Sequence, residues 1–254
     1  MTLTLTVLGS GTAIPEPDRF PAGYLVQGAG ETVLVDCGPG VLRRLAATGT
    51  GLEDLTAVLL THFHTDHCAD VAALLFALRN PRYAGRPPLR LWAAPGLRTW
   101  LAHLTAAWPW LRPRSDTDLE LRELEPGEHR LGRLRVAAYP VNHTAESLAY
   151  RLTTDEGLGP LTFSGDADEG LGLVDAARGA RLFVCDAAFP DQAYVPGHLT
   201  PGRAGRVAAA AGATTLCLTH FYPECQGTDL LAQARATFGG EVVLAHDSRR
   251  FELA

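Results

Sequence analysis

Three imidazoles and one carboxylate fall within seven consecutive residues, Thr61-His62-Phe63-His64-Thr65-Asp66-His67. They follow the apolar run Ala57–Leu60, so we expect them on a loop at the carboxyl end of a buried strand. Such spacing lets a tight loop present one pair of side chains to a cation and the next pair to a neighbouring cation. Neutral imidazole and carboxylate are ligands that Zn²⁺ and similar divalent ions accept. The alternative is a polar loop that only caps the next helix, but four ligand-type side chains rarely crowd together without a cation. The pattern therefore predicts a metal site.

Three further ligand-type side chains follow other apolar runs along the chain. His143 comes after the expected strand Arg133–Tyr139, Asp166 after Leu161–Ser164, and His220 after Thr215–Thr219. Each of them alone is most simply a cap or turn residue. As a set, however, they share the strand-end position of the first cluster, and strand ends at one sheet edge are where sites are commonly built. We therefore expect all three to join the same site.

The elements that position these residues are short strands and strand–helix units. Two successions of strands and then strand–helix units fit a two-sheet core with helices outside both sheets. We expect one domain over residues 1–254, with Arg112–Asp118 as a connection between its halves rather than a boundary. The predicted strands are Leu3–Leu8, Tyr24–Gln27, Thr32–Asp36, Ala57–Leu60, Leu89–Ala93, Leu119–Leu124, Arg133–Tyr139, Leu148–Thr153, Leu161–Ser164, Leu182–Cys185, Thr215–Thr219, Val242–Ala245 and Phe251–Leu253. The predicted helices are Val41–Ala47, Ala69–Leu78, Pro95–Trp108, Leu171–Ala177, Arg203–Ala211 and Leu230–Phe238.

Composition narrows the class of protein. Apolar residues make up 46% of 254 residues, which is ample for a sizeable core. The net charge of −6 argues against broad nucleic-acid binding. Five cysteines without a Cys-x-x-Cys pair do not suggest a disulfide framework. The amino-terminal segment Met1–Leu8 alternates with period two and lacks a basic start, and no apolar run approaches the roughly 20 residues of a membrane helix. We therefore expect a cytoplasmic protein without a membrane partner, with a homodimer as one arrangement.

With these motifs the chain resembles the metallo-β-lactamase superfamily. Within that superfamily it is most similar to the branch of tRNA 3′-processing ribonuclease Z and related phosphodiesterases. The narrower resemblance lies in the Gly-rich turn Leu8-Gly9-Ser10-Gly11-Thr12-Ala13-Ile14-Pro15 and in Gly197-His198-Leu199-Thr200. The resemblance implies an α/β fold, an αββα four-layer sandwich of two mixed β-sheets with helices on the outer faces.

The resemblance also implies a dinuclear centre. His62, His64 and His143 would hold one metal ion, Asp66, His67 and His220 the other, and Asp166 would bridge both. The cofactors would be two divalent metal ions, with zinc as the default and manganese or iron as alternatives. Cys68 stands beside His67, but we expect its thiol to turn into the following helix instead of binding metal.

Two further residues are expected near the metals from the same resemblance. His198 would donate a hydrogen bond to a non-bridging or leaving oxygen, and Asp186 would hold its tautomer. Ribonuclease Z uses Glu in the place of Asp186, so the contact here would be made by a shorter side chain. As alternatives, Asp186 only caps its strand and His198 only precedes a helix that begins at Thr200-Pro201. The expected catalytic residues are Asp66, His198 and Asp186.

The expected reaction is hydrolysis by in-line attack of a metal-bridging hydroxide on a small cyclic or nucleotide phosphodiester. Ribonuclease Z enzymes carry a long tRNA-gripping arm between the His143-type and Asp166-type ligands, whereas only 22 residues separate those positions here. A small-molecule partner is therefore expected, and tRNA is not. The alternatives are a tRNA 3′-processing endoribonuclease, a lactonase or thioester hydrolase of the same fold, and a metal-stabilised binding protein.

Overall fold

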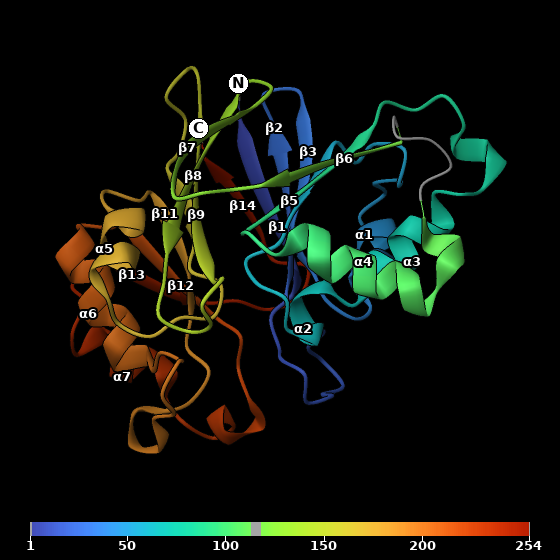
Figure 1. The fold of residues 1–254 in the computed structure, drawn as a ribbon. Helices are drawn as coiled ribbons and strands as arrows, with labels where there is room; N and C mark the ends of the chain where they lie inside the picture. Colours follow the sequence, from blue (N-terminus) through green and yellow to red (C-terminus); the bar gives the residue numbers. More distant parts are fainter. Residues whose placement is uncertain (1, 113–117, 254) are drawn as a thin grey trace.

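Two seven-stranded β-sheets lie face to face, with helices on both outer sides, in the computed structural model, which describes residues 2–112 and 118–253 (Figure 1). The first sheet is antiparallel at one end and parallel from its fourth strand onward. In spatial order its strands are β14 (Arg250–Leu253), β1 (Leu3–Gly9), β2 (Gly23–Gly28), β3 (Glu31–Cys37), β4 (Ala57–Leu59), β5 (Leu89–Ala93) and β6 (Leu119–Glu123).

The second sheet is also mixed. Its parallel part joins β10 to β13, and its antiparallel part joins β7 to β10. In spatial order its strands are β13 (Glu241–Leu244), β12 (Thr215–Thr219), β11 (Leu182–Asp186), β10 (Leu161–Phe163), β9 (Leu148–Thr154), β8 (Leu134–Pro140) and β7 (Gly127–Leu131). The predicted pair of mixed sheets is therefore confirmed.

Helices cover the outer faces of both sheets. Figure 1 shows α1, α3 and α4 beside the first sheet, and α5, α6 and α7 beside the second. The helices are α1 (Val41–Ala47), α2 (Thr65–Cys68), α3 (Asp70–Ala77), α4 (Leu97–Ala107), α5 (Leu171–Ala177), α6 (Pro201–Ala211) and α7 (Leu230–Arg235). Together with the sheets they make the expected αββα sandwich.

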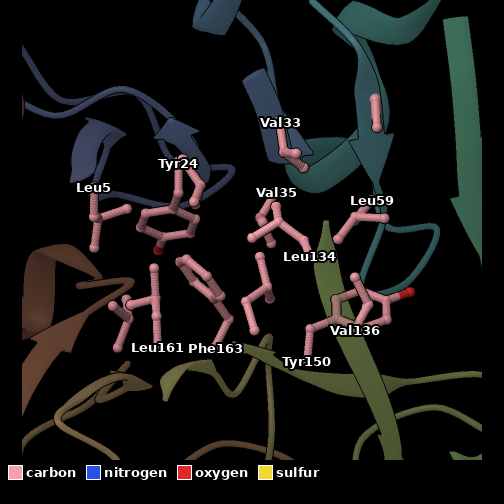
Figure 2. Close-up of a cluster of buried hydrophobic side chains, with 14 of the residues drawn as sticks. Leu5, Tyr24, Val33, Val35, Leu59, Leu134, Val136, Tyr150, Leu161 and Phe163 are labelled. Carbon is pink, nitrogen blue, oxygen red and sulfur yellow. The ribbon is translucent and has the colours of Figure 1, made fainter. Parts of the chain in front are cut away.

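Strand alternation explains why the sheets are apolar on both faces. Successive side chains of a strand point to opposite faces, so a strand buried on both sides is apolar throughout. In β3, Val33 and Val35 join the core between the sheets, whereas Leu34 packs toward the helices. Figure 2 shows residues of the two sheets facing one another across this central core, including Val35 from one side and Phe163 from the other.

The parallel strands place the functional loops at one edge. A right-handed strand–helix–strand unit returns the chain so that successive parallel strands end at the same edge of the sheet. The loops after β4, β10, β11 and β12 therefore leave their sheets at carboxyl ends. These are the loops that carry the histidine motif, Asp166, His198 and His220.

Some local predictions differ from the structure. The edge strand β7 was not expected, because its sequence Gly-Glu-His-Arg-Leu is charged, as is common for strands at a sheet edge. The short helix α2 begins inside the histidine motif, where a loop was predicted. Most of the predicted Arg112–Asp118 connection lies outside the described residues.

No helix in the described ranges is long and apolar enough to cross a membrane. The assignment of one domain stays a prediction.

Candidate metal centre

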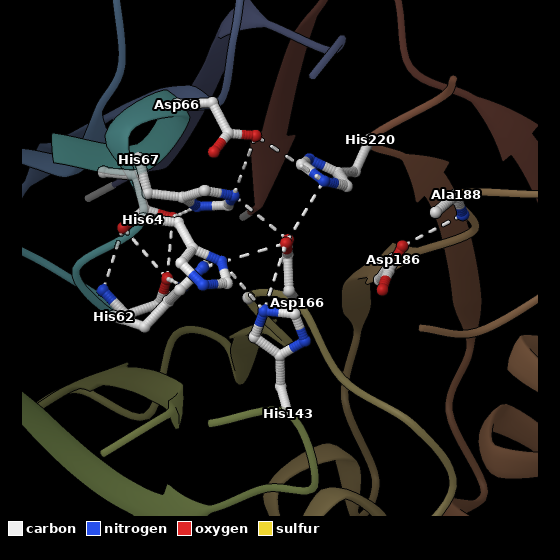
Figure 3. Close-up of polar contacts among 12 residues, drawn as sticks. His62, His64, Asp66, His67, His143, Asp166, Asp186, Ala188 and His220 are labelled. Atoms are coloured by element: carbon white, nitrogen blue, oxygen red, sulfur yellow. Dashed lines mark hydrogen bonds and ion pairs between the residues drawn. The ribbon is translucent and has the colours of Figure 1, made fainter. Parts of the chain in front are cut away.

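Seven side chains from four separate segments converge at the carboxyl edge of the sheets (Figure 3). His62 and His64 lie on the loop after β4, and Asp66 and His67 lie in α2. The other three come from the loops after β8, β10 and β12, and they are His143, Asp166 and His220. Figure 3 shows the carboxylate of Asp166 in the middle, with imidazoles around it. The sequence-predicted ligand set is thus brought together without exception.

The first group of donors consists of three imidazoles and the shared carboxylate. The potential ligand atoms of His62, His64, His143 and Asp166 all lie within 4.8 Å of one another. Nε2 of His143 is 3.1 Å from Nδ1 of His64, and Nε2 of His62 is 3.8 Å from Oδ2 of Asp166. Two ring nitrogens that face one another at such a distance are arranged as donors to a common point. This is the group predicted for one metal ion.

The second group lies on the other side of the shared carboxylate. Asp66, His67 and His220 also offer ligand atoms within 4.8 Å of one another. Nε2 of His67 is 3.1 Å from Oδ1 of Asp166, and Nε2 of His220 is 3.2 Å from its Oδ2. Asp166 therefore touches both groups, as a bridging carboxylate would.

The buried donor atoms fit divalent cations. Nε2 of His62, His67 and His220 is buried and has no hydrogen-bond partner in the described part of the chain, and neither does Oδ1 of Asp166. Buried polar atoms without partners are costly, and two metal ions, one in each group, would satisfy them. The donor set, made of imidazoles and carboxylates without thiolate, suits zinc, manganese or iron.

The electrostatics favour the metal-binding forms of His62, His143 and Asp166. For His67, burial would lower the pKa, but the carboxylates of Asp166 and Asp36 raise it well above its ordinary value. Burial, followed by the charge of His67, lowers the pKa of His62 to about 2, so its imidazole is neutral. Burial also lowers the pKa of His143. Burial alone would raise the pKa of the Asp166 carboxyl, but the adjacent imidazoles of His220 and His67 hold it well below its usual range. Neutral imidazole and ionised carboxylate are the forms that bind metal.

Asp36 holds predicted metal ligands in place, and the sequence analysis did not predict this role. Its Oδ2 lies 2.8 Å from Nδ1 of His67, and its Oδ1 accepts a 2.8 Å hydrogen bond from the backbone N–H of Thr61. The Thr61 hydroxyl in turn lies 3.1 Å from Nδ1 of His62. Asp36 is completely buried, with φ of 60°. The available signal was an acidic residue at the end of the apolar run 32–36, the same strand-end position used for the other predictions.

We expect Asp36→Asn to weaken metal binding about 10- to 100-fold, because partners that orient a ligand histidine typically contribute that much. The amide cannot accept from both His67 and Thr61 as the carboxylate does. The measurement is metal affinity by competition with a chromogenic chelator. Asp70→Asn is the matched control, since Asp70 accepts from the backbone of Gly40 and Leu42 and contacts no predicted ligand. Equal affinities in the two variants would contradict the assigned role.

His198 and Asp186 lie together beside the second group. Nδ1 of His198 is 3.0 Å from Oδ2 of Asp186 and 4.0 Å from Oδ2 of Asp166. Asp186 is completely buried at the end of β11, and its Oδ1 accepts from the backbone N–H of Ala188 (Figure 3). Burial would lower the pKa of His198, but the hydrogen bond and charge of Asp186 raise it to about 9. The shorter aspartate therefore reaches the imidazole, and it caps its strand end as well.

The loop that carries His198 is fastened by a second carboxylate, Asp168. Its Oδ2 accepts from the Tyr194 hydroxyl at 2.5 Å and from the Gly197 N–H at 3.4 Å, and its Oδ1 accepts from Arg203 at 3.0 Å. The Gly197 carbonyl accepts from Nδ1 of His143 at 2.8 Å, which leaves Nε2 of that histidine to face the donor group. Asp168 thus holds the loop whose backbone orients a predicted metal ligand.

Cys68 takes no part in the donor groups. Its thiol donates to the carbonyls of Phe63 and His64, at 3.3 and 3.1 Å, inside the turn that α2 begins. Burial raises the pKa of this thiol to about 12. A thiol held in that form is a poor metal ligand, in agreement with the orientation predicted for it.

Comparison with known proteins places this geometry in a family. A profile described as "Beta-lactamase superfamily domain" matches residues 31–221. Ribonuclease Z of Mycobacterium marinum is 32% identical over 277 aligned positions that cover 99% of each protein. The metallo-beta-lactamase fold protein YhfI from Bacillus subtilis is 26% identical, with 99% of each chain covered and a TM-score of 0.86. The short form of human tRNase Z is 23% identical, with 98% of each chain covered and a TM-score of 0.77, a likeness that concerns the fold alone.

The profile match, the full-length relative and the cluster of imidazoles and carboxylates agree with one another. The chain therefore belongs to the metallo-β-lactamase superfamily, as a metal-dependent hydrolase related to ribonuclease Z.

Proposed function

We propose that this chain hydrolyses small phosphodiesters at a centre of two divalent ions. The observation that supports this most is the pair of donor groups that share Asp166, with His198 next to them. His62, His64 and His143 would hold one ion, Asp66, His67 and His220 the other, and zinc is the first choice for these donors. Two such ions, when bound, supply a nucleophilic water near neutral pH and neutralise charge on phosphoryl oxygens.

The chain's own residues would then orient the substrate and move a proton. His198 is held by Asp186 at Nδ1, so its Nε2 is the atom left for the substrate. In that position it donates to a phosphoryl or leaving oxygen, and the carboxylate fixes the tautomer that makes this donation possible. Asp66, buried next to His67 and His220, keeps a carboxylate at the site's rim. Hydrolysis of a phosphodiester would use the His198 imidazole in particular, because the departing alkoxide needs a proton.

A small substrate is supported by what lies between two of the predicted ligands. The segment from His143 to Asp166 consists of β9, the connection 155–160 and β10, which form a plain antiparallel pair. A tRNA-gripping arm of the kind expected in ribonuclease Z is absent from this segment. The alignment with the M. marinum enzyme also runs over 277 positions against 254 residues here, so that enzyme carries at least 23 residues without a counterpart in this chain. The net charge of −6 adds repulsion toward a long polyanion.

The test is a metal analysis followed by a substrate panel. We expect two divalent ions per chain, and turnover of bis(p-nitrophenyl) phosphate and of cyclic nucleotides at least about tenfold above that of lactones and thioesters, a difference of about 1.4 kcal/mol in transition-state stabilisation. Precursor tRNA serves as the competing substrate. Faster cleavage of precursor tRNA than of every small diester would contradict the proposal, and so would inactivity toward all diesters with zinc, manganese and iron alike.

A further inference from the structure

A cavity of about 310 Å³ opens next to the metal centre, and Asp66 belongs to both. This volume is at the lower end of what small-ligand pockets offer, roughly 300–1,000 Å³. Most of its wall comes from the segment that follows β1, and the rest comes from Pro39 and the start of α2. The lining residues are Ala13, Pro15, Glu16, Arg19, Phe20, Pro21, Pro39, Thr65 and Asp66. A substrate bound at the metals therefore has a mostly apolar space beside it for one of its two ester groups.

The wall formed by the segment after β1 is held firmly in place. Asp247 accepts from the backbone N–H groups of Ser10 at 3.0 Å and of Phe20 at 2.9 Å, and the Phe20 carbonyl accepts from Gly11 at 2.8 Å. The Phe20 ring packs closely on Gly40, where a Cβ atom would come within 2.4 Å of the ring. The guanidinium of Arg44 lies 5.6 Å from the ring centroid. An aromatic side chain that is fixed in this way suits stacking against a flat ligand.

The polar groups of the cavity indicate the chemistry of that ligand. Glu16 accepts from the Gln226 side chain at 3.3 Å through Oε1, and its Oε2 has no hydrogen-bond partner among the described residues. Arg19, the cation of the cavity, donates through Nη1 to the Ser10 hydroxyl and the Ala245 carbonyl and lies over the Phe221 ring, so Nη1 is already committed to the protein. A free carboxylate acceptor disfavours a second phosphate and favours a neutral group with N–H donors.

We propose that this cavity binds the nucleobase of a purine nucleoside phosphodiester, with the base stacked on Phe20 and its N–H groups donating to Glu16. This assignment rests on the proposed function, because it places the phosphodiester at the metals. The assignment adds the identity of the group next to the phosphodiester in the substrate, which is a flat heterocycle with N–H donors. The free carboxylate of Glu16 would repel the next phosphate of a polynucleotide and so restrict the site to short substrates.

Binding without turnover is the first experiment. Guanosine and adenosine, which contain no phosphate, are titrated into the full chain and followed by ligand-observed NMR, alongside unsubstituted purine riboside, which lacks the exocyclic amino group. We expect the amino-bearing nucleosides to bind at least about fivefold more tightly, and Glu16→Gln to remove this difference. Asp18→Asn is the matched control, because Asp18 is an exposed acid on the same segment that does not line the cavity. Equal binding of all three nucleosides would overturn the assignment.

Turnover by the metal-loaded enzyme is the second experiment, and it separates this inference from the proposed function. We expect Phe20→Leu to raise KM for cyclic purine nucleotides about tenfold with little change in kcat, because stacking on the base is lost. Ile14→Ala, at an exposed residue of the same loop outside the cavity, should leave KM unchanged. If KM for diesters does not depend on the purine base in any variant, the cavity assignment alone is overturned. If nucleosides bind but no diester is hydrolysed, the proposed function alone is overturned.

Discussion

Asp166→Asn is expected to lower kcat/KM for phosphodiesters about 10³-fold or more and to reduce bound metal to one ion per chain or fewer. Among the described residues, Asp166 is the carboxylate that contacts both donor groups, at 3.8 Å from His62 in the first and 3.1 Å from His67 in the second. An amide has one oxygen and no charge, so it cannot serve two cations. Loss of a dinuclear centre removes both the activated water and the charge neutralisation, which together amount to several kcal/mol of barrier. Metal stoichiometry by mass spectrometry and diester kinetics measure the two effects.

A second variant guards against a folding defect, since Asp166 is buried among charged neighbours. His64→Ala removes one donor from an exposed position, where the fold does not depend on the side chain. It should lose metal from the first group and lower activity while its thermal unfolding in the presence of chelator stays like that of the parent chain. Retention of two ions and of full activity in both variants would rule out the shared centre.

The second large effect concerns the proton donor. We expect His198→Ala to lower kcat about 10²- to 10⁴-fold, the usual range for a positioned acid or base, with metal content unchanged. Asp186→Asn should lower kcat by a smaller factor, because the asparagine side chain still reaches His198 but no longer fixes its tautomer. The measurement is steady-state kinetics with a diester whose leaving group is a poor one, since a good leaving group such as p-nitrophenolate needs little protonation.

The double variant tests whether these two residues act as one unit. If Asp186 acts on the reaction only through His198, adding Asp186→Asn to His198→Ala should cost almost nothing more. Additive losses would mean that Asp186 has a separate structural duty through the backbone N–H groups of Ala167 and Ala188 that it also accepts from. Identical rate losses with good and poor leaving groups would contradict the donor role of His198.

Much of the site could be predicted because its signals are local. The histidine motif lies within seven consecutive residues, and the strand-end positions of His143, Asp166 and His220, taken as a set, pointed to the same site. Alternation of apolar residues gave most strands to within two residues of their observed bounds. The ends of the helices were predicted less closely: α7 ends at Arg235, three residues earlier than expected. The helix ends there although the apolar pattern of the sequence continues to Phe238.

The remaining parts depend on contacts between distant residues. Asp36 is 31 positions away from His67, and no spacing rule joins an acid on one strand to a histidine on a later helix. β7 carries mostly polar side chains because it has one neighbour only, so its pairing with β8 is visible in the fold but not in its own sequence. The cavity next to Asp66 likewise forms from three segments that are distant in sequence, and most of its residues look like an ordinary proline-rich turn.

The fastening of residues 194–198 by Asp168 has a consequence for how this protein could diversify. One carboxylate secures both the segment that bears His198 and the carbonyl that aims His143. Substitutions in residues 194–198 would therefore disturb both the position of the proton donor His198 and the binding of metal by His143. Altered substrate selectivity is accordingly not expected to arise in that segment. The wall that includes Glu16 and Phe20 is held instead by Asp247, near the other end of the sequence, through the backbone N–H groups of Ser10 and Phe20 and not through a predicted metal ligand. New specificities should accordingly accumulate there first.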